Sequence, residues 1–270
     1  MKLIKVKLIR YTPEGEKLVA VAAKQSLSRK PFEYQWGKMS DEEVEVWIKE
    51  TLKRNHLSPW EHSVYTFVIE GISRACSHQL VRHRIASYTQ LSQRFAKMIK
   101  EYFSIVKPPR ISENSEASKI FDEAVSKAYE AYVKLLDLRI PPEDARYVLP
   151  QAVTTKIVVT MNARELRHFF GLRTCLKAQW EIRYVAWKMR EELLKVHPLL
   201  FKWTGPRCIN IENVTRKSEP ITVEDILSNK AMLTIERCPE NIVARNIPQC
   251  IKRALSIVSI LENRAYNVVD

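Results

Sequence analysis

The sequence predicts an α+β fold in which helices are in the majority. Two observations carry this prediction. Several long segments repeat apolar residues at spacings of three and four, as amphipathic helices do. A smaller number of short runs are rich in β-branched and aromatic residues, as strands are. The chain has 270 residues, of which 46% are hydrophobic, so it can bury a substantial core.

Three segments predict strands. Residues 2–10 alternate with a period close to two. Residues 63–70 and 154–160 are dominated by β-branched and aromatic side chains. The polar, irregular segment 85–95 matches neither pattern, and we expect an ordered loop there.

Helices are predicted by caps and by apolar periodicity. Ser40 and Glu43 form a capping box that opens a helix, and residues 115–138 carry the longest apolar stripe. The remaining predicted helices begin at Ser58, run from Ser73 to Arg84, cover 143–149, start at Asn162 with an interruption at Gly171 before Arg173, and cover 175–196.

The composition changes after Gly205 and Pro206. Residues 207–220 are polar and resemble a linker, and weak helical patterns follow at 222–229 and 247–265. We therefore expect a catalytic domain over residues 1–208 and a C-terminal extension of unknown role over residues 209–270.

Charge and cysteine usage bound the function. Lysine and arginine number 44 against 31 acidic residues, a net charge of +13, which favours anionic partners such as nucleotides or nucleic acid. Five cysteines include no closely spaced ligand pair, so no metal site is expected. No signal peptide or membrane-spanning run is evident, and a cytoplasmic location with no membrane partner is expected.

Glycine is scarce, with five residues in the chain. Neither a GxGxxG nor a GxxxxGK[ST] phosphate-binding loop can be written with them. Any nucleotide must therefore be held by side chains and helix termini.

Clustered arginines are the strongest functional signal. Arg82-His83-Arg84 is followed by Ser92 and Arg94, and guanidinium groups bind phosphate and carboxylate bidentately. Further arginines stand at the predicted ends of helices: Arg146, Arg164 and Arg173. Each one alone could be a surface arginine paired with an acidic residue, whereas the whole set indicates a phosphorylated substrate or cofactor.

Several alternatives remain open at this stage. Ser92 with His83 as base would make a hydrolase, although no GxSxG elbow is present. A nucleic-acid-binding protein would use the net charge, but the arginines are dispersed and no RNA or DNA motif is present. Smaller candidates are a Cys175 thiolate, a metal held by His56, His62, His78 and His83 with Glu61, and stacking of a flat heterocycle on Trp60, Tyr65 and Tyr88.

The ordered motifs resemble a known family. Arg82-His83-Arg84, seven residues and then Ser92 resemble the RHR-x7-S signature of flavin-dependent thymidylate synthases, the ThyX family. Further segments similar to the family follow its order and spacing: Ser58-Pro59-Trp60-Glu61-His62, Gln79, 145–150 (ARYVLP), 162–164 (NAR), Leu172-Arg173 and 178–183 (AQWEIR). The resemblance covers about residues 40 to 208.

The resemblance implies a helix-rich protein with a central, mainly antiparallel sheet, assembled as a homotetramer whose subunits share sites. It implies methylation of dUMP to dTMP, with 5,10-methylenetetrahydrofolate as carbon donor and NADPH as reductant through FAD. Arg173 would be the catalytic residue, which activates the uracil ring by stabilising negative charge on it. Ser92 would then be a ligand contact.

Two residue sets follow from the resemblance. FAD would contact Ser58, Arg82, His83, Arg84, Gln90, Asn162, Arg164 and His168. The substrate dUMP would contact Gln79, Leu80, Val81, Arg82, Gln90, Leu91, Ser92, Gln93, Arg94, Arg146 and Arg173.

Overall fold

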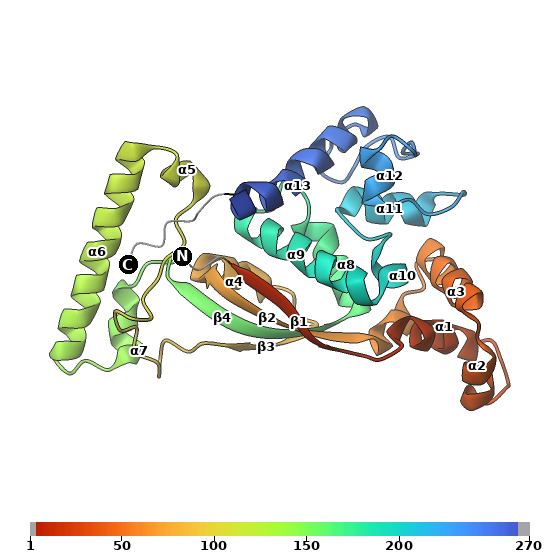
Figure 1. Cartoon of the computed structure of the whole chain (residues 1–270), viewed down its shortest axis with the longest axis horizontal. Helices are drawn as coiled ribbons and strands as arrows, with labels where there is room; N and C mark the ends of the chain where they lie inside the picture. Colours follow the sequence, from red (N-terminus) through yellow and green to blue (C-terminus); the bar gives the residue numbers. More distant parts are fainter. Residues whose placement is uncertain (1–3, 264–270) are drawn as a thin grey trace.

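The structure, a computed structural model, describes residues 4–263 and has a four-stranded antiparallel sheet at its centre (Figure 1). The strand order is β1-β2-β4-β3, with bounds β1 Lys5–Tyr11, β2 Val64–Ser73, β4 Thr154–Asn162 and β3 Ala86–Gln90. Each neighbouring pair is antiparallel. The predicted helix-rich α+β class with an antiparallel sheet is confirmed.

Helices precede, interrupt and follow these strands. Before β2 come α1 (Gly15–Gln25), α2 (Phe32–Lys38), α3 (Asp41–Lys53) and the 3₁₀ turn η1 (Ser58–His62). Between β2 and β4 come α4 (Arg74–Leu80), α5 (Pro109–Ser112), α6 (Ser115–Asp137), α7 (Pro142–Ala145) and η2 (Arg146–Val148). After β4 come α8 (Ala163–Arg173), α9 (Trp180–Val196), α10 (Pro198–Phe201), α11 (Arg207–Thr215), α12 (Val223–Leu227), η3 (Ala244–Asn246) and α13 (Ile247–Asn263).

One face of the sheet carries the core. Alternate residues of β2 and β4 are buried there, and α4, α8 and α9 lie over the sheet on that side in Figure 1. The residues between them on the opposite face include Val158, which is 37% exposed. Alternating burial of this kind is typical of an antiparallel sheet covered on one side.

Most predicted elements are confirmed. The Ser40 capping box opens α3, Ser73 caps α4, and the Asn162 side chain caps α8 by accepting from the Glu165 amide. The long predicted helix is α6, and the predicted strands correspond to β1, β2 and β4. The short helix predicted for 143–149 is divided between α7 and η2.

The strand predictions need two corrections. The segment 85–95 is not all loop, because residues 86–90 form the edge strand β3 on β4. This short strand is half-exposed and has little apolar character, so its pairing is set by contacts distant in sequence. Strand β2 does not end at Glu70, because Gly71 takes a φ of 79° in a bulge and pairing resumes at Ile72.

The helix predictions also need corrections. The helix predicted to reach Arg84 ends at Leu80, and Tyr88 donates its hydroxyl to the carbonyls of Leu80 and His83 in the turn that follows. Helix α8 runs through Gly171 without interruption. Helix α9 begins at Trp180, not near residue 175. Helices α1 and α2 were not predicted at all.

The segment 207–220 is not a linker. Residues 207–215 form α11, whose Asn210, Glu212 and Asn213 are buried. These polar side chains made the segment look solvent-exposed, but each has partners elsewhere in the chain. The apolar core also continues into α12 and α13. The domain boundary at residue 208 stays a prediction.

Helix α6 stands apart from the body of the molecule in Figure 1. Of its apolar stripe only Val125 and Tyr132 are buried, and Ile120 is 63% exposed. No helix within residues 4–263 is long and apolar enough to cross a membrane.

Candidate active site

Helix α4 is the element on which the site is built, and α9 fixes where it begins. Glu181 of α9 accepts hydrogen bonds from the backbone N and the hydroxyl of Ser73, both at 2.6 Å. The Ser73 hydroxyl oxygen in turn accepts from the Cys76 amide and caps α4. Burial raises the pKa of the Glu181 carboxyl to about 7.

Three side chains form a connected chain beyond the other end of α4. Arg173 Nε donates to His83 Nε2 at 3.1 Å, and His83 Nδ1 lies 3.2 Å from Glu165 Oε1. His83 and Glu165 are both buried. Arg173 Nη2 also donates to the Gln79 carbonyl at 3.3 Å, so Arg173 is anchored on two sides.

These contacts set the tautomer of His83. Since Nε2 accepts a hydrogen bond from Arg173, the proton must lie on Nδ1, which donates it to Glu165. Burial lowers the pKa of Arg173, which makes no ion pair with a carboxylate of the described chain. A partly desolvated arginine without a counter-ion attracts an anionic or polarisable ligand.

A second group of predicted residues lies at the exposed end of α7. Arg94 Nε pairs with Glu143 Oε2 at 2.6 Å, and Arg146 Nε donates to the Glu143 carbonyl at 3.0 Å. The Ser92 hydroxyl oxygen accepts from the Arg94 amide. Burial, and secondarily the charge of Arg146, lowers the pKa of Arg74, at the start of α4.

Gln90 lies between these two groups. Its amide nitrogen donates to the hydroxyl oxygens of Ser77 at 2.9 Å and Thr155 at 3.2 Å. Gln90 therefore joins β3 to the middle of α4 and to β4, and its side chain is held within the chain.

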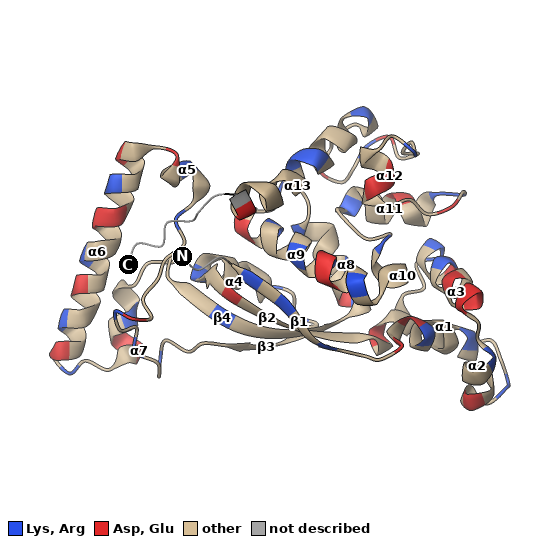
Figure 2. Ribbon diagram, viewed as in Figure 1, with Lys and Arg blue, Asp and Glu red and all other residues tan. Residues whose placement is uncertain are grey.

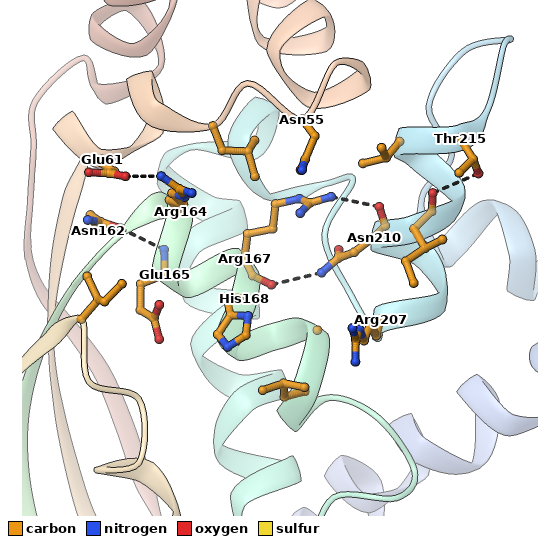
Figure 3. Close-up of a pocket in the computed structure, with 16 residues that line it drawn as sticks. Asn55, Glu61, Asn162, Arg164, Glu165, Arg167, His168, Arg207, Asn210 and Thr215 are labelled. Atoms are coloured by element: carbon orange, nitrogen blue, oxygen red, sulfur yellow. Dashed lines mark hydrogen bonds and ion pairs between the residues drawn. The ribbon is translucent and has the colours of Figure 1, made fainter. Parts of the chain in front are cut away.

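A cavity of about 650 Å³ lies beside α8 (Figure 3). Three of the residues predicted to contact FAD line it: Asn162, Arg164 and His168. Arg164 Nη1 pairs with Glu61 Oε1 at 2.5 Å, and the His168 ring lies edge-on to that of His83 at 5.8 Å. The cavity therefore adjoins the buried chain that ends at Arg173.

The other predicted site residues are brought into neither group by contacts. Ser58, Arg82 and Arg84 are exposed, and their side chains make no hydrogen bond or ion pair with another described residue. Leu80 is buried in the core and Val81 is 37% exposed. Leu91 and Gln93 are half-buried on the segment that leads to Arg94.

The geometry does not favour the alternative chemistries. Both ring nitrogens of His83 are engaged by Arg173 and Glu165, so His83 is not poised as a base for Ser92. Burial raises the pKa of Cys175, the opposite of an activated thiolate. Trp60 and Tyr65 are fully buried, as expected of core residues rather than stacking platforms.

The histidine cluster predicted as a weak metal candidate does not converge. Within residues 4–263 the group of three possible ligands is His83, Glu165 and His168, whose ligand atoms lie within 4.8 Å of one another. Because Arg173 and Glu165 already occupy the His83 nitrogens, this group serves hydrogen bonding better than metal ligation.

The basic residues are dispersed over the fold. Figure 2 shows lysine and arginine on the sheet and on most of the helices, interspersed with acidic residues. A nucleic-acid-binding surface would instead gather them on one face or stripe.

The chain is similar to known proteins of one family over most of its length. The family model for thymidylate synthase complementing protein matches residues 7–199. The flavin-dependent thymidylate synthase of Sulfurisphaera tokodaii is 53% identical over 258 residues, which are 95% of this chain and 99% of the relative. The chain belongs to the flavin-dependent thymidylate synthase family. It is therefore an enzyme of that class.

Two further matches differ in how much of this chain they cover. The flavin-dependent thymidylate synthase of Geobacter sulfurreducens is 45% identical over 206 residues, 76% of this chain and 89% of the relative. A solved structure, the UMP/dUMP methylase PolB from Streptomyces cacaoi bound with 5-Br dUMP, matches with a TM-score of 0.64 and 26% identity. It covers 74% of this chain and 94% of that protein.

Sequence reasoning missed four residues that shape the site. Glu165 was overlooked because a glutamate three residues after an N-cap asparagine is usually part of a helix start. Arg167, Arg207 and Asn210 also line the cavity. Arg207 and Asn210 belong to the segment that was taken for a linker, so no sequence signal pointed to them.

Proposed function

We propose that this chain catalyses the reductive methylation of dUMP to dTMP. The carbon donor is 5,10-methylenetetrahydrofolate, and NADPH is the reductant through FAD. The observation that carries the proposal is the buried Glu165–His83–Arg173 chain, which holds the arginine expected to activate the substrate.

Arg173 would act by electrostatic stabilisation. His83 Nε2 and the Gln79 carbonyl each take one of its N–H donors, and the other N–H groups stay available to the carbonyl oxygens of a uracil ring. Its guanidinium stays protonated at neutral pH. In a site partly shielded from water, a fixed positive charge stabilises developing negative charge strongly, because no solvent must reorganise.

The residues of the cavity fit a flavin dinucleotide. Three arginines line it together with Asn162 and His168, and the buried Nε of Arg167 has no hydrogen-bond partner in the described chain. Asn162, Arg164 and His168 would hold FAD there, with Ser58, Arg82, His83, Arg84 and Gln90 completing the set. The flavin, when bound, supplies the hydride transfer from NADPH.

The phosphate of dUMP would bind at the group formed by Arg94 and Arg146. Arg94 and Arg146 both contact Glu143, and the Ser92 hydroxyl oxygen accepts a hydrogen bond from the Arg94 amide. Guanidinium groups in this arrangement suit the bidentate recognition of a phosphate.

We infer a homotetramer with sites shared between subunits. The apolar stripe of α6 is largely uncovered in the single chain, as is one face of the sheet. Arg82 and Arg84 have no side-chain partner among residues 4–263. Copies that cover the apolar surfaces could also bring these arginines to a neighbouring site.

The test uses the purified full-length protein. We expect a flavin absorbance band that NADPH bleaches, and dTMP formation that needs dUMP, methylenetetrahydrofolate and NADPH together. Omitting each in turn is the control. Colourless protein that cannot be reconstituted with FAD, or flavin-loaded protein that forms no dTMP, would reject the proposal.

A further inference from the structure

The cavity beside α8 has two walls that come from different parts of the chain. Asn162, Arg164 and His168 lie on or next to α8, within the region matched by the family model. Arg207 and Asn210 lie on α11, beyond the end of that match at residue 199. The C-terminal part of the chain therefore builds part of the cavity.

The wall formed by α11 is fixed in place on α8. Arg167 Nη2 donates to the Asn210 carbonyl at 2.9 Å, and Asn210 Nδ2 donates to the Arg167 carbonyl at 3.1 Å (Figure 3). A Cβ at Gly171 would lie 2.9 Å from Asn210 Nδ2, so a larger residue at this position would displace the Asn210 amide. The geometry is set before any ligand binds.

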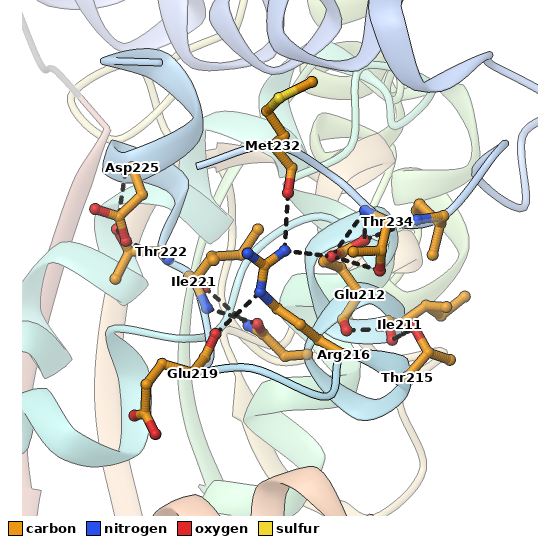
Figure 4. A network of polar contacts seen from close by, with 12 residues as sticks. Ile211, Glu212, Thr215, Arg216, Glu219, Ile221, Thr222, Asp225, Met232 and Thr234 are labelled. Atoms are coloured by element: carbon orange, nitrogen blue, oxygen red, sulfur yellow. Dashed lines mark hydrogen bonds and ion pairs between the residues drawn. The ribbon is translucent and has the colours of Figure 1, made fainter. Parts of the chain in front are cut away.

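The other side of α11 is anchored equally firmly. Glu212 is fully buried and accepts hydrogen bonds from the backbone N of Thr234 and of Ile235 (Figure 4). It also accepts from Arg216 Nη1 at 2.8 Å. Because α11 is held on both sides, Arg207 at its first turn projects from a rigid element.

The cavity has more positive charge than its own carboxylates balance. Arg164 is paired with Glu61. Arg167 is 8% exposed, its pKa is lowered to about 10 by burial, and no described carboxylate pairs with it. Arg207 is exposed, and its side chain has no hydrogen-bond or ion-pair partner within residues 4–263. The two unpaired arginines predict an anionic group in the ligand.

We propose that α11 is a wall of the cofactor site and that Arg207 binds the diphosphate of FAD. The inference rests on the proposed function, because it takes FAD as the occupant of this cavity. A diphosphate offers the paired anionic oxygens that a guanidinium fork binds, and a cavity of about 650 Å³ is of ligand-binding size. The C-terminal segment thereby acquires a role in cofactor binding.

The experiment measures flavin binding rather than turnover. Flavin-free full-length protein is titrated with FAD and with riboflavin, which lacks phosphate, and quenching of flavin fluorescence gives each Kd. We expect Arg207→Ala to weaken FAD binding about tenfold, the loss of one charge-assisted hydrogen bond, and to leave riboflavin binding unchanged. The Kd of Arg207→Lys for FAD should lie between those of the wild type and Arg207→Ala.

Lys252→Ala is the matched control. Lys252 is an exposed cation of the same C-terminal segment, on α13, and does not line the cavity. Its removal changes the net charge equally and should leave both Kd values unchanged. Arg207→Gln keeps most of the side chain and should behave as Arg207→Ala, and melting temperatures of all variants should match that of the wild type.

Three outcomes would overturn the inference. FAD binding that is equal in Arg207→Ala and wild type would show that Arg207 makes no contact with FAD. Equal weakening of FAD and riboflavin would show an effect on the cavity rather than on the diphosphate. Unchanged FAD binding with a raised KM for NADPH would assign the arginine to the other dinucleotide. If the wild type itself binds no flavin, the proposed function fails instead.

Discussion

Arg173 and Arg94 are both expected to meet the substrate, yet the structure holds them differently. Arg173 is anchored by His83 and the Gln79 carbonyl, and His83 is anchored in turn by buried Glu165. The Arg94 side chain is 57% exposed and pairs with Glu143, whose side chain is 44% exposed. An exposed ion pair contributes about 0–1 kcal/mol, so a ligand or another subunit can redirect Arg94 at little cost. Folding of the chain sets the position of the first arginine, whereas that of the second is adjustable.

The sharpest way to break this comparison is to remove the anchored arginine. We expect Arg173→Ala to lower kcat about a thousandfold, because a fixed donor is lost where negative charge develops. FAD binding should be largely spared, since Arg173 does not line the cavity. Single-turnover dTMP formation measures the loss of catalytic rate, and flavin titration measures FAD binding. A variant with wild-type kcat would show that Arg173 has no catalytic role.

Buried polar contacts should also make stability depend on pH. His197 Nε2 accepts from the Gly15 amide and its Nδ1 lies 2.7 Å from the Tyr65 hydroxyl. Burial lowers the pKa of His197 from 6.5 to about 4. The unfolded chain therefore binds more protons between these values, and the free energy of unfolding should fall by about 3 kcal/mol as pH drops from 6.5 to 4.

The check compares wild type with His197→Gln by urea unfolding at several pH values. The pH profile of the variant is subtracted from that of the wild type, because Glu181 acts in the opposite direction. Its pKa is raised to about 7, so its protonated form stabilises the folded state, and this stabilisation is lost as pH rises from 4.5 to 7. The variant should lack the His197 part of the slope. Parallel pH profiles for the two proteins would contradict the prediction.

The anchoring of Arg173 can be tested at Glu165, which contacts Arg173 only through His83. Glu165→Leu removes the acceptor for His83 Nδ1, so the proton can shift to Nε2, which would then oppose the Arg173 Nε–H. We expect kcat to fall about a hundredfold through this displacement, with the KM for dUMP nearly unchanged. Glu165→Gln keeps an oxygen acceptor and should restore most of the activity. Equal losses in the two variants would reject the tautomer argument.

The sequence predicted the parts of the site that local rules govern. The Asn162 and Ser73 caps and the β4 strand depend on neighbouring residues, and the structure has them where they were expected. Family motifs pointed to Arg173 and His83. The structure places these two side chains in contact across 90 positions, and their assigned roles stay a prediction.

The rest depended on partners distant in sequence. Glu212 and Asn210 give α11 a polar composition that resembles a linker. Their hydrogen-bond partners, Thr234 and Arg167, are distant in sequence, so no local pattern shows that these polar groups are satisfied. Strand β3 was missed because its pairing with β4 is what makes it a strand. The wall of the cavity formed by Arg207 was hidden for the same reason.

The adjustable arginine gives the smallest and most selective effect. Arg94→Ala should change the free energy of unfolding by less than about 0.5 kcal/mol, because only an exposed ion pair is lost. If Arg94 binds the substrate phosphate, the KM for dUMP should rise about tenfold, with kcat unchanged at saturation. Glu143→Gln is the matched control, since it breaks the same ion pair and keeps the arginine. It should leave KM unchanged or lower it, because the guanidinium no longer has to leave a carboxylate. A rise in KM in Glu143→Gln as large as that in Arg94→Ala would show that the ion pair itself orients Arg94, and that Arg94 is anchored much as Arg173 is.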